Sequence, residues 1–134
     1  MQSKTRKVAI LGGNRIPFAR SNTAYTGISN QEMLTAAIDG LVARFNLEGE
    51  RIGEVAAGAV LKHARDFNLA RESVLSTRLA PETPAVDLQQ ACGTGLQAAI
   101  YLANKIALGQ IDSGIAGGTD TTSDAPLAIG DKLR

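Results

Sequence analysis

The hydrophobic and polar residues of this chain fall into blocks that predict helices and strands in alternation. Between residues 34 and 45, apolar side chains recur at helical spacing, and Ser29 with Glu32 supplies a capping-box pattern at the start. Residues 54–61 are apolar almost throughout instead of alternating with polar ones. That pattern is typical of a central strand covered on both faces. We therefore predict a helix that begins after Ser29 and stops at Gly49, followed by a buried strand.

Four predicted strands alternate with three predicted helices along the chain. The apolar run 7–11, closed by two glycines, predicts a buried first strand, and the runs 85–90 and 113–116 predict the third and fourth. The remaining helices are expected over residues 68–79 and 93–108. This order predicts an α/β fold with a mostly parallel sheet and right-handed crossovers.

Composition and charge narrow the classes of function. At 134 residues the chain holds one domain at most, with 44% hydrophobic residues for a modest core. Its 14 basic and 13 acidic residues nearly cancel, so nucleic acid is not an expected partner. A single cysteine excludes an internal disulfide and fits a reducing compartment, so we expect a cytoplasmic protein. The apolar run behind the basic N-terminus is too short for a signal peptide or a membrane span.

Cys92 lies where the third predicted strand passes into the third predicted helix. Residues 93–108 are nearly all apolar, which predicts a helix buried on most sides. Free backbone N–H groups and the positive end of the macrodipole favour the thiolate form of a cysteine at a helix start. Gly93 and Gly95 leave space above the sulfur, as an incoming acyl group requires. The alternative is a cysteine buried for packing alone.

Two segments resemble signature segments of the thiolases. Residues 89–98, Gln-Gln-Ala-Cys-Gly-Thr-Gly-Leu-Gln-Ala, resemble the nucleophile segment of that family. Residues 116–126, Ala-Gly-Gly-Thr-Asp-Thr-Thr-Ser-Asp-Ala-Pro, resemble its Ala-Gly-Gly-x-Glu/Asp-x-x-Ser-x-x-Pro segment. The resemblance implies that Cys92 is the catalytic nucleophile and that three glycines belong to the substrate pocket. These are Gly93, Gly117 and Gly118.

The resemblance also implies a reaction, its substrates and its partners. Thiolases cleave 3-oxoacyl-coenzyme A (CoA) to acetyl-CoA and a shortened acyl-CoA, or run the reverse Claisen condensation, with no metal and no bound cofactor. Acyl-CoA and CoA are then substrates, and the enzyme is at least a homodimer. Residues 15–20, together with Gln89, Gly93, Thr94 and the threonines of residues 119–122, resemble the β-subunit branch of the fatty-acid trifunctional complexes. A hydratase/dehydrogenase α-subunit is the partner which that branch implies. Apart from this resemblance, we interpret residues 15–20 as a loop with Phe18 beneath the sheet.

The resemblance covers only the N-terminal half-domain of a thiolase. We therefore expect residues 1–134 to be an incomplete piece, inactive alone, without the loop domain and the C-terminal half. An uncovered sheet edge and an uncovered helix would then expose apolar surface. In the family, the histidine that draws the thiol proton belongs to the missing half. The only histidine here, His63, is a candidate base, but its polar loop favours a solvated side chain.

Two other classes of function stay open. A 3-oxoacyl synthase-type condensing enzyme keeps the strand, cysteine and helix arrangement but accepts an acyl carrier protein. The Gly-Gly-x-Asp-x-x-Ser pattern that begins at Gly117 argues against it. A non-catalytic interaction module would keep the fold without the chemistry.

Overall fold

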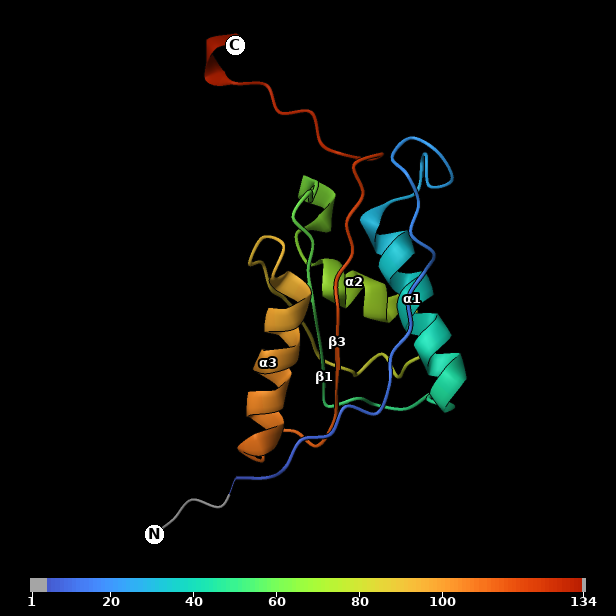
Figure 1. Cartoon of the computed structure of the whole chain (residues 1–134), viewed down its shortest axis with the longest axis vertical. Coiled ribbons are helices and arrows are strands. Elements are labelled where there is room, and N and C mark those ends of the chain that lie inside the picture. The colour runs from blue at the N-terminus through green and yellow to red at the C-terminus, as the bar shows by residue number, and fades with distance from the viewer. Residues whose placement is uncertain (1–4, 134) are drawn as a thin grey trace.

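The chain folds as a parallel sheet with helices on both of its faces. The computed structural model describes residues 5–133 (Figure 1). The strands are β1 (Glu54–Ala57), β2 (Ala85–Asp87) and β3 (Gly114–Ala116), in the spatial order β2-β1-β3. Both pairings are parallel, and Val55 lies opposite Ala85 on one side and Ile115 on the other. The predicted α/β class with a parallel sheet is confirmed.

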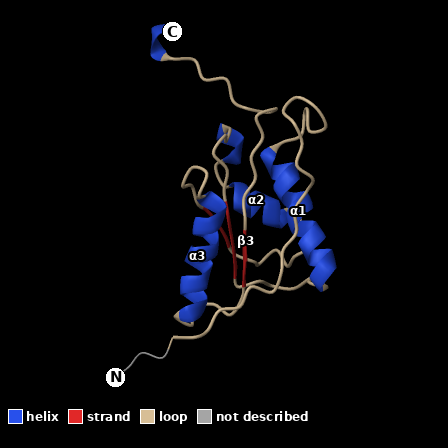
Figure 2. Ribbon diagram, in the orientation of Figure 1, coloured by secondary structure: helices blue, strands red, loops and turns tan. Residues whose placement is uncertain are grey.

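Among the described residues, three α-helices cover this sheet, one short 3₁₀ helix lies between β1 and α2, and a second lies near the C-terminal end (Figure 2). The α-helices are α1 (Asn30–Phe45), α2 (Leu69–Leu75) and α3 (Thr94–Ala107). The 3₁₀ helices span Ala64–Asp66 and Asp131–Leu133. Along the part of the chain that the structure describes, no helix is long and apolar enough to cross a membrane.

The central strand β1 contributes to two separate cores, because its side chains alternate between the faces of the sheet. Val55 and Ala57 are buried in the larger core with α1 and α2. Ala56 is buried on the opposite face against Ala98 and Leu102 of α3. Both faces of the strand therefore carry buried apolar side chains, as its almost entirely hydrophobic run predicts.

Helix α1 begins with the predicted capping box. The Ser29 hydroxyl accepts a hydrogen bond from the Glu32 N–H at 3.2 Å, and the Glu32 carboxylate accepts one from the Ser29 N–H at 2.8 Å. The helix ends at Phe45, four residues before the glycine that was expected to stop it. Asn46 ends it instead by adopting the left-handed conformation at φ 54°.

The predicted first strand is wrong. Residues 7–11 are extended chain outside the sheet, and the side chains of Ile10 and Leu11 are 94% and 85% exposed. The segment that follows them runs beside β3, between it and α1 (Figure 1). A strand needs the N–H and C=O groups of a neighbour at hydrogen-bonding distance, and a cavity separates residues 12–14 from β3. The apolar run therefore has no partner to pair with.

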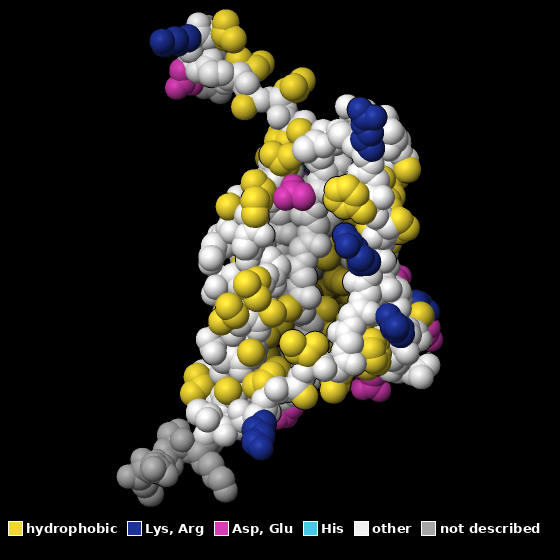
Figure 3. Space-filling view, in the orientation of Figure 1, with side chains coloured by type: hydrophobic (Ala, Val, Ile, Leu, Met, Phe, Trp, Pro, Cys, Tyr) yellow, Lys and Arg dark blue, Asp and Glu magenta, His cyan; other side chains and the backbone are white. Residues whose placement is uncertain are grey.

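Helix α3 is buried on one side only, which corrects the prediction of burial on most sides. Leu96, Ile100 and Leu108 are 71%, 45% and 65% exposed, and hydrophobic side chains gather on the surface over this helix (Figure 3). The predicted exposure of apolar surface is thus confirmed for this helix. The other large correction concerns Phe18, which is 90% exposed instead of lying beneath the sheet. The loop that carries Phe18 lines one side of a cleft, and the side chain of Phe18 therefore does not pack against the sheet.

Candidate functional site

A wide cleft lies beyond the carboxyl ends of the three strands, where parallel α/β sheets commonly bind ligands. Its volume is about 830 Å³. The loops after β1 (residues 58–61) and β3 (residues 118–123) form part of its wall, and residues 14–21 form another part. Ala91, Cys92, Thr94 and Gly95 contribute the turn that follows β2. The cleft therefore collects residues from four distant parts of the sequence.

Cys92 is exposed and lines this cleft on the turn between β2 and α3. Helix α3 begins two residues later, at Thr94. Within residues 5–133, no hydrogen bond from the backbone N–H of Cys92 or of Gly95 to another backbone group is seen, and Cys92 forms an isolated parallel bridge with Gln90. Unpaired N–H groups at a helix start attract negative charge, which here would be a thiolate or an oxyanion. The predicted position of the cysteine at the helix start is confirmed, and burial for packing alone is wrong.

The turn that carries Cys92 is closed by Thr94, to which the sequence analysis gave no structural role. The Thr94 hydroxyl accepts a hydrogen bond from the Gln90 N–H at 2.9 Å and donates one to the Ala91 carbonyl at 2.7 Å. Its side chain is buried, with 5% of the residue exposed. Ala91 itself adopts a positive φ of 44°. The sequence signal for this arrangement is a threonine within the first turn of a predicted helix.

Asp120, the acidic residue of the Gly-Gly-x-Asp-x-x-Ser pattern, joins the loops after β1 and β3, a role that the sequence analysis did not predict. Its two carboxylate oxygens accept hydrogen bonds from the backbone N–H groups of Val60 and Leu61, both at 2.9 Å. The Thr119 N–H donates to the Gly58 carbonyl at 3.0 Å, which extends the contact between the two loops. One wall of the cleft is therefore fixed by an anion bound to successive amides.

The structure separates the three glycines that the resemblance places in the substrate pocket. Gly118 lines the cleft beside Cys92, and a Cβ at this position would lie 2.9 Å from the Gly58 carbonyl oxygen. A smaller cavity is lined by both Gly117 and Gly118, so Gly118 lies between the two spaces and Gly117 lines only the smaller one. Gly93 is the N-cap residue of α3 and is not among the described residues that line the cleft.

The side chain of His63 contacts Asp124 and does not line the cleft that contains Cys92. Its Nε2 atom lies 2.5 Å from the Asp124 carbonyl oxygen and 3.5 Å from the Asp124 carboxylate, which also pairs with Arg65. Within residues 5–133, the cleft lining includes Cys92 but not His63. The arrangement gives His63 the role of holding the loop after β3 and does not support it as the base.

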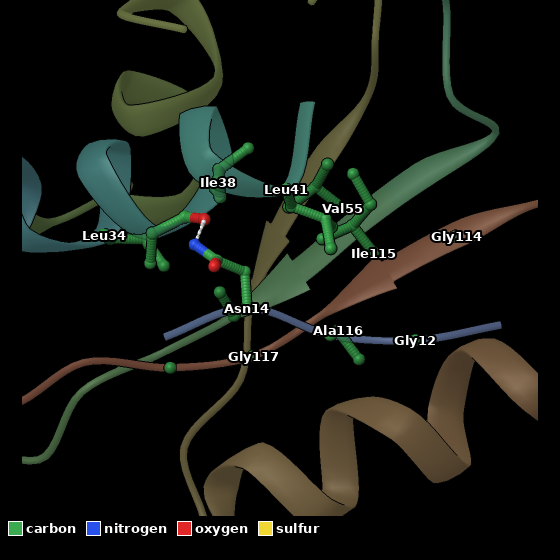
Figure 4. A pocket seen from close by; sticks show the side chains of 14 residues that line it. Gly12, Asn14, Leu34, Ile38, Leu41, Val55, Gly114, Ile115, Ala116 and Gly117 are labelled. Atoms are coloured by element: carbon green, nitrogen blue, oxygen red, sulfur yellow. Dashed lines mark hydrogen bonds between the residues drawn. The ribbon is translucent and has the colours of Figure 1, made fainter. Parts of the chain in front are cut away.

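The smaller cavity, of about 180 Å³, separates the N-terminal segment from β3 (Figure 4). Figure 4 shows Leu34, Ile38 and Leu41 of α1 beside Val55 and Ile115 of the sheet. Its polar contact is the hydrogen bond from the Asn14 amide to the Ala37 carbonyl, at 2.9 Å. Its apolar side chains offer no reactive group. Over the described part of the chain, no set of three His, Cys, Asp or Glu side chains is arranged to hold a metal ion either.

Curated proteins of known name resemble nearly the whole chain. The 3-ketoacyl-CoA thiolase of Shewanella sp. (strain ANA-3) is 37% identical over 131 residues, which are 98% of this chain and 30% of the relative. The enzyme of the same name from Shewanella pealeana is 35% identical over the same share of each chain. This chain therefore spans about a third of the length of these relatives.

The fold agrees with that of a solved enzyme. The crystal structure of the Bacillus anthracis acetyl-CoA acetyltransferase superposes with a TM-score of 0.77 at 24% sequence identity, over 84% of this chain and 28% of that one. At this identity, the likeness concerns the fold alone. Residues 8–134 also match the family model described as "Thiolase, N-terminal domain". The match takes in both signature segments and Cys92, and this chain accordingly belongs to the thiolase family.

Proposed function

We propose that Cys92 is the nucleophile of a thiolase-type acyl transfer. Its thiolate attacks the 3-keto carbonyl of a 3-oxoacyl-CoA, and the bond between the second and third acyl carbons breaks. The two-carbon unit takes up a proton and leaves as acetyl-CoA. The shortened acyl group stays on sulfur until the thiol of free CoA takes it and restores Cys92. The same steps in reverse form a carbon–carbon bond.

One observation carries this proposal. The only cysteine of the chain is exposed, lines the cleft at the strand ends, and lies directly before the start of α3. A cysteine that only fills a core would be enclosed by apolar side chains.

The backbone N–H of Cys92 is the proposed first donor to the oxyanion. The tetrahedral intermediate places a negative oxygen close to the attacked carbon, and a pre-oriented N–H stabilises that charge. Among the residues described, this N–H donates to no other backbone group, so it is free for such an oxygen. Gly118 is the proposed pocket residue beside it, because it lines the same cleft. Gly93 and Gly117 have weaker support, since they lie outside the lining.

The reaction needs groups that these residues do not supply. A base must take the thiol proton and a second donor must reach the oxyanion, and we propose that both come from a C-terminal half. The exposed apolar face of α3, formed by Leu96, Ile100 and Leu108, supports this idea, because such a face calls for a partner surface. Without that half we expect the chain to be inactive.

The finer assignments are also proposals. We propose an assembly of at least two copies in the cytoplasm, with CoA as a substrate and no bound cofactor. Membership of the trifunctional β-subunit branch, with its α-subunit partner, rests on residues 15–20, Gln89, Gly93, Thr94 and the threonines of residues 119–122. The threonines of residues 119–122 line the cleft, and we propose that they contact the substrate and influence which acyl groups are accepted.

The test uses the complete translation product that contains this chain. It is incubated with acetyl-CoA, and the mass of the peptide that carries Cys92 is measured, with Cys92→Ser as the control. An acetyl group on Cys92 that free CoA removes is the expected result. If Cys92 accepted an acyl group from an acyl carrier protein but not from acetyl-CoA, the protein would instead be a 3-oxoacyl synthase. No adduct on a folded protein would indicate a non-catalytic module.

A further inference from the structure

We propose that Thr94 is a positioning residue for Cys92, because its buried hydroxyl holds the preceding turn in the conformation that presents the cysteine to the cleft. This inference rests on the proposed function, since it explains how the nucleophile is oriented. Thr94 is buried beneath the turn, with 5% of the residue exposed, whereas Cys92 is exposed.

The conformation that needs support is that of Ala91. Its φ of 44° lies in the left-handed region, which residues with a Cβ atom rarely adopt. No glycine occupies this position to relieve the conflict. Residues held in such regions persist where the surroundings fix them, and they cluster at functional sites. Contacts with neighbouring residues must therefore stabilise the positive φ of Ala91, because its own backbone preference disfavours it.

The Thr94 hydroxyl supplies two of those contacts. It accepts a hydrogen bond from the Gln90 N–H at 2.9 Å and donates one to the Ala91 carbonyl at 2.7 Å. The Ala91 carbonyl shares a trans peptide plane with the Cys92 N–H, so the two groups point in opposite directions. Holding the carbonyl against the buried hydroxyl therefore turns the Cys92 N–H outward. The Thr94 backbone N–H also donates to this carbonyl, at 3.2 Å, so the hydroxyl and the N–H of one residue together hold the strained residue and the direction of the proposed oxyanion donor.

Thr94 is itself held in place by the end of β1. A Cβ on Gly58 would lie 2.9 Å from the Thr94 methyl carbon, so the methyl group rests directly on that glycine. A branched β-carbon also restricts the side-chain rotamer. The hydroxyl is therefore fixed relative to the sheet, and through it the cysteine turn is fixed as well.

The test measures, in the complete translation product, how fast iodoacetamide alkylates the peptide that carries Cys92. Thr94→Val keeps the shape of the side chain and removes the hydroxyl, whereas Thr94→Ser keeps the hydroxyl and removes the methyl group. We expect Thr94→Val to slow alkylation about tenfold and Thr94→Ser to stay within about twofold of the parent, since the lost hydrogen bonds are worth about that factor. If Thr94→Val does not fold, Thr94→Ala replaces it, because its smaller side chain leaves room for a water.

A second pair of variants separates positioning from a general loss of stability. Glycine adopts a positive φ without penalty. With Ala91→Gly, the alkylation rate of Cys92 should therefore depend less on the Thr94 hydroxyl. We expect Ala91→Gly/Thr94→Val to react within about threefold of Ala91→Gly alone. An equal loss in both backgrounds would overturn the inference, as would equal rates in Thr94→Ser and Thr94→Val.

The two proposals fail in different ways. A parent chain whose Cys92 reacts no faster than a cysteine in a short unstructured peptide would overturn the proposed role of the cysteine, and the role of Thr94 with it. A fast parent rate with an unchanged Thr94→Val rate would overturn the role of Thr94 alone.

Discussion

Gly58 lies so close to Leu88 that a Cβ on the glycine would stand 1.8 Å from the Leu88 carbonyl oxygen. The two residues follow β1 and β2, and the Leu88 N–H donates to the Ala57 carbonyl at 3.0 Å. The sheet pairing therefore continues to the edge of the cleft only because position 58 has no side chain. The cysteine turn begins immediately after this point.

Gly58→Ala should destabilise the chain by about 2 kcal/mol, because the added methyl group forces the two strand ends apart. The measurement is the free energy of unfolding in urea. Gly95→Ala is the matched control, since a Cβ there meets nothing within 4 Å. It should shift stability by less than about 1 kcal/mol, in the stabilising direction expected for alanine in a helix. Similar losses in both variants would contradict the close approach.

Asp120→Asn should loosen the loop after β1. The carboxylate accepts from two backbone N–H groups, Val60 and Leu61, whereas an amide offers only one oxygen. We expect a loss of about 1–3 kcal/mol and faster amide hydrogen exchange at these two residues. Asp131→Asn, in the 3₁₀ helix near the chain end, should leave both measurements unchanged. Unchanged exchange at Val60 and Leu61 would count against the role given to Asp120.

The capping box of α1 predicts a dependence of stability on acid. Hydrogen bonds from the Ser29 backbone N–H first and its hydroxyl second hold the pKa of Glu32 below its ordinary value of 4.5. A carboxyl with a lowered pKa in the folded state stabilises the protein above 4.5, and this contribution is lost as the pH falls through the folded value. Thermal unfolding of the parent and of Glu32→Gln, compared across that range, should show the parent losing its advantage. Ser29→Ala should cost about 1 kcal/mol at neutral pH.

The ion pair between Lys105 of α3 and Glu54 of β1 predicts that substitutions at the two positions have non-additive effects on the free energy of unfolding. The Lys105 ammonium pairs with the Glu54 carboxylate, whose side chain is only 10% exposed and which also accepts from the Tyr101 hydroxyl at 3.1 Å. Lys105→Met should therefore destabilise more than the double variant Glu54→Gln/Lys105→Met, because the single change leaves a nearly buried charge unpaired. Urea unfolding of the set measures the difference, and additive losses would rule out the coupling.

The same pair predicts an alkaline effect of opposite sign to that of Glu32. Hydrogen bonds to Glu54 first and Tyr101 second raise the pKa of Lys105 above its ordinary value of 10.5. A lysine with a raised pKa stabilises the fold fully below 10.5 and loses this contribution as the pH rises through the folded value. The stability difference between the parent and Lys105→Met should therefore narrow in strong alkali. A constant difference would contradict the assignment.

Local patterns were sufficient to predict several elements of the fold. The capping residues Ser29 and Glu32 lie three positions apart, so the start of α1 depends only on neighbouring chain. The unbroken apolar run of β1 requires two covered faces, and the structure provides both. The place of Cys92 before α3 follows from the change of period between a strand and a helix.

What the sequence determined by itself was the three α-helices, three of the four expected strands and the one cysteine at a strand-to-helix turn. Only the tertiary structure decided that residues 7–11 pair with no strand, that α3 leaves an apolar face open, and that Asp120 binds two amides of a distant loop. Periodicity and caps are set by residues a few positions apart. Pairing and burial depend instead on which distant surfaces meet, and hydrophobicity alone does not specify the partner.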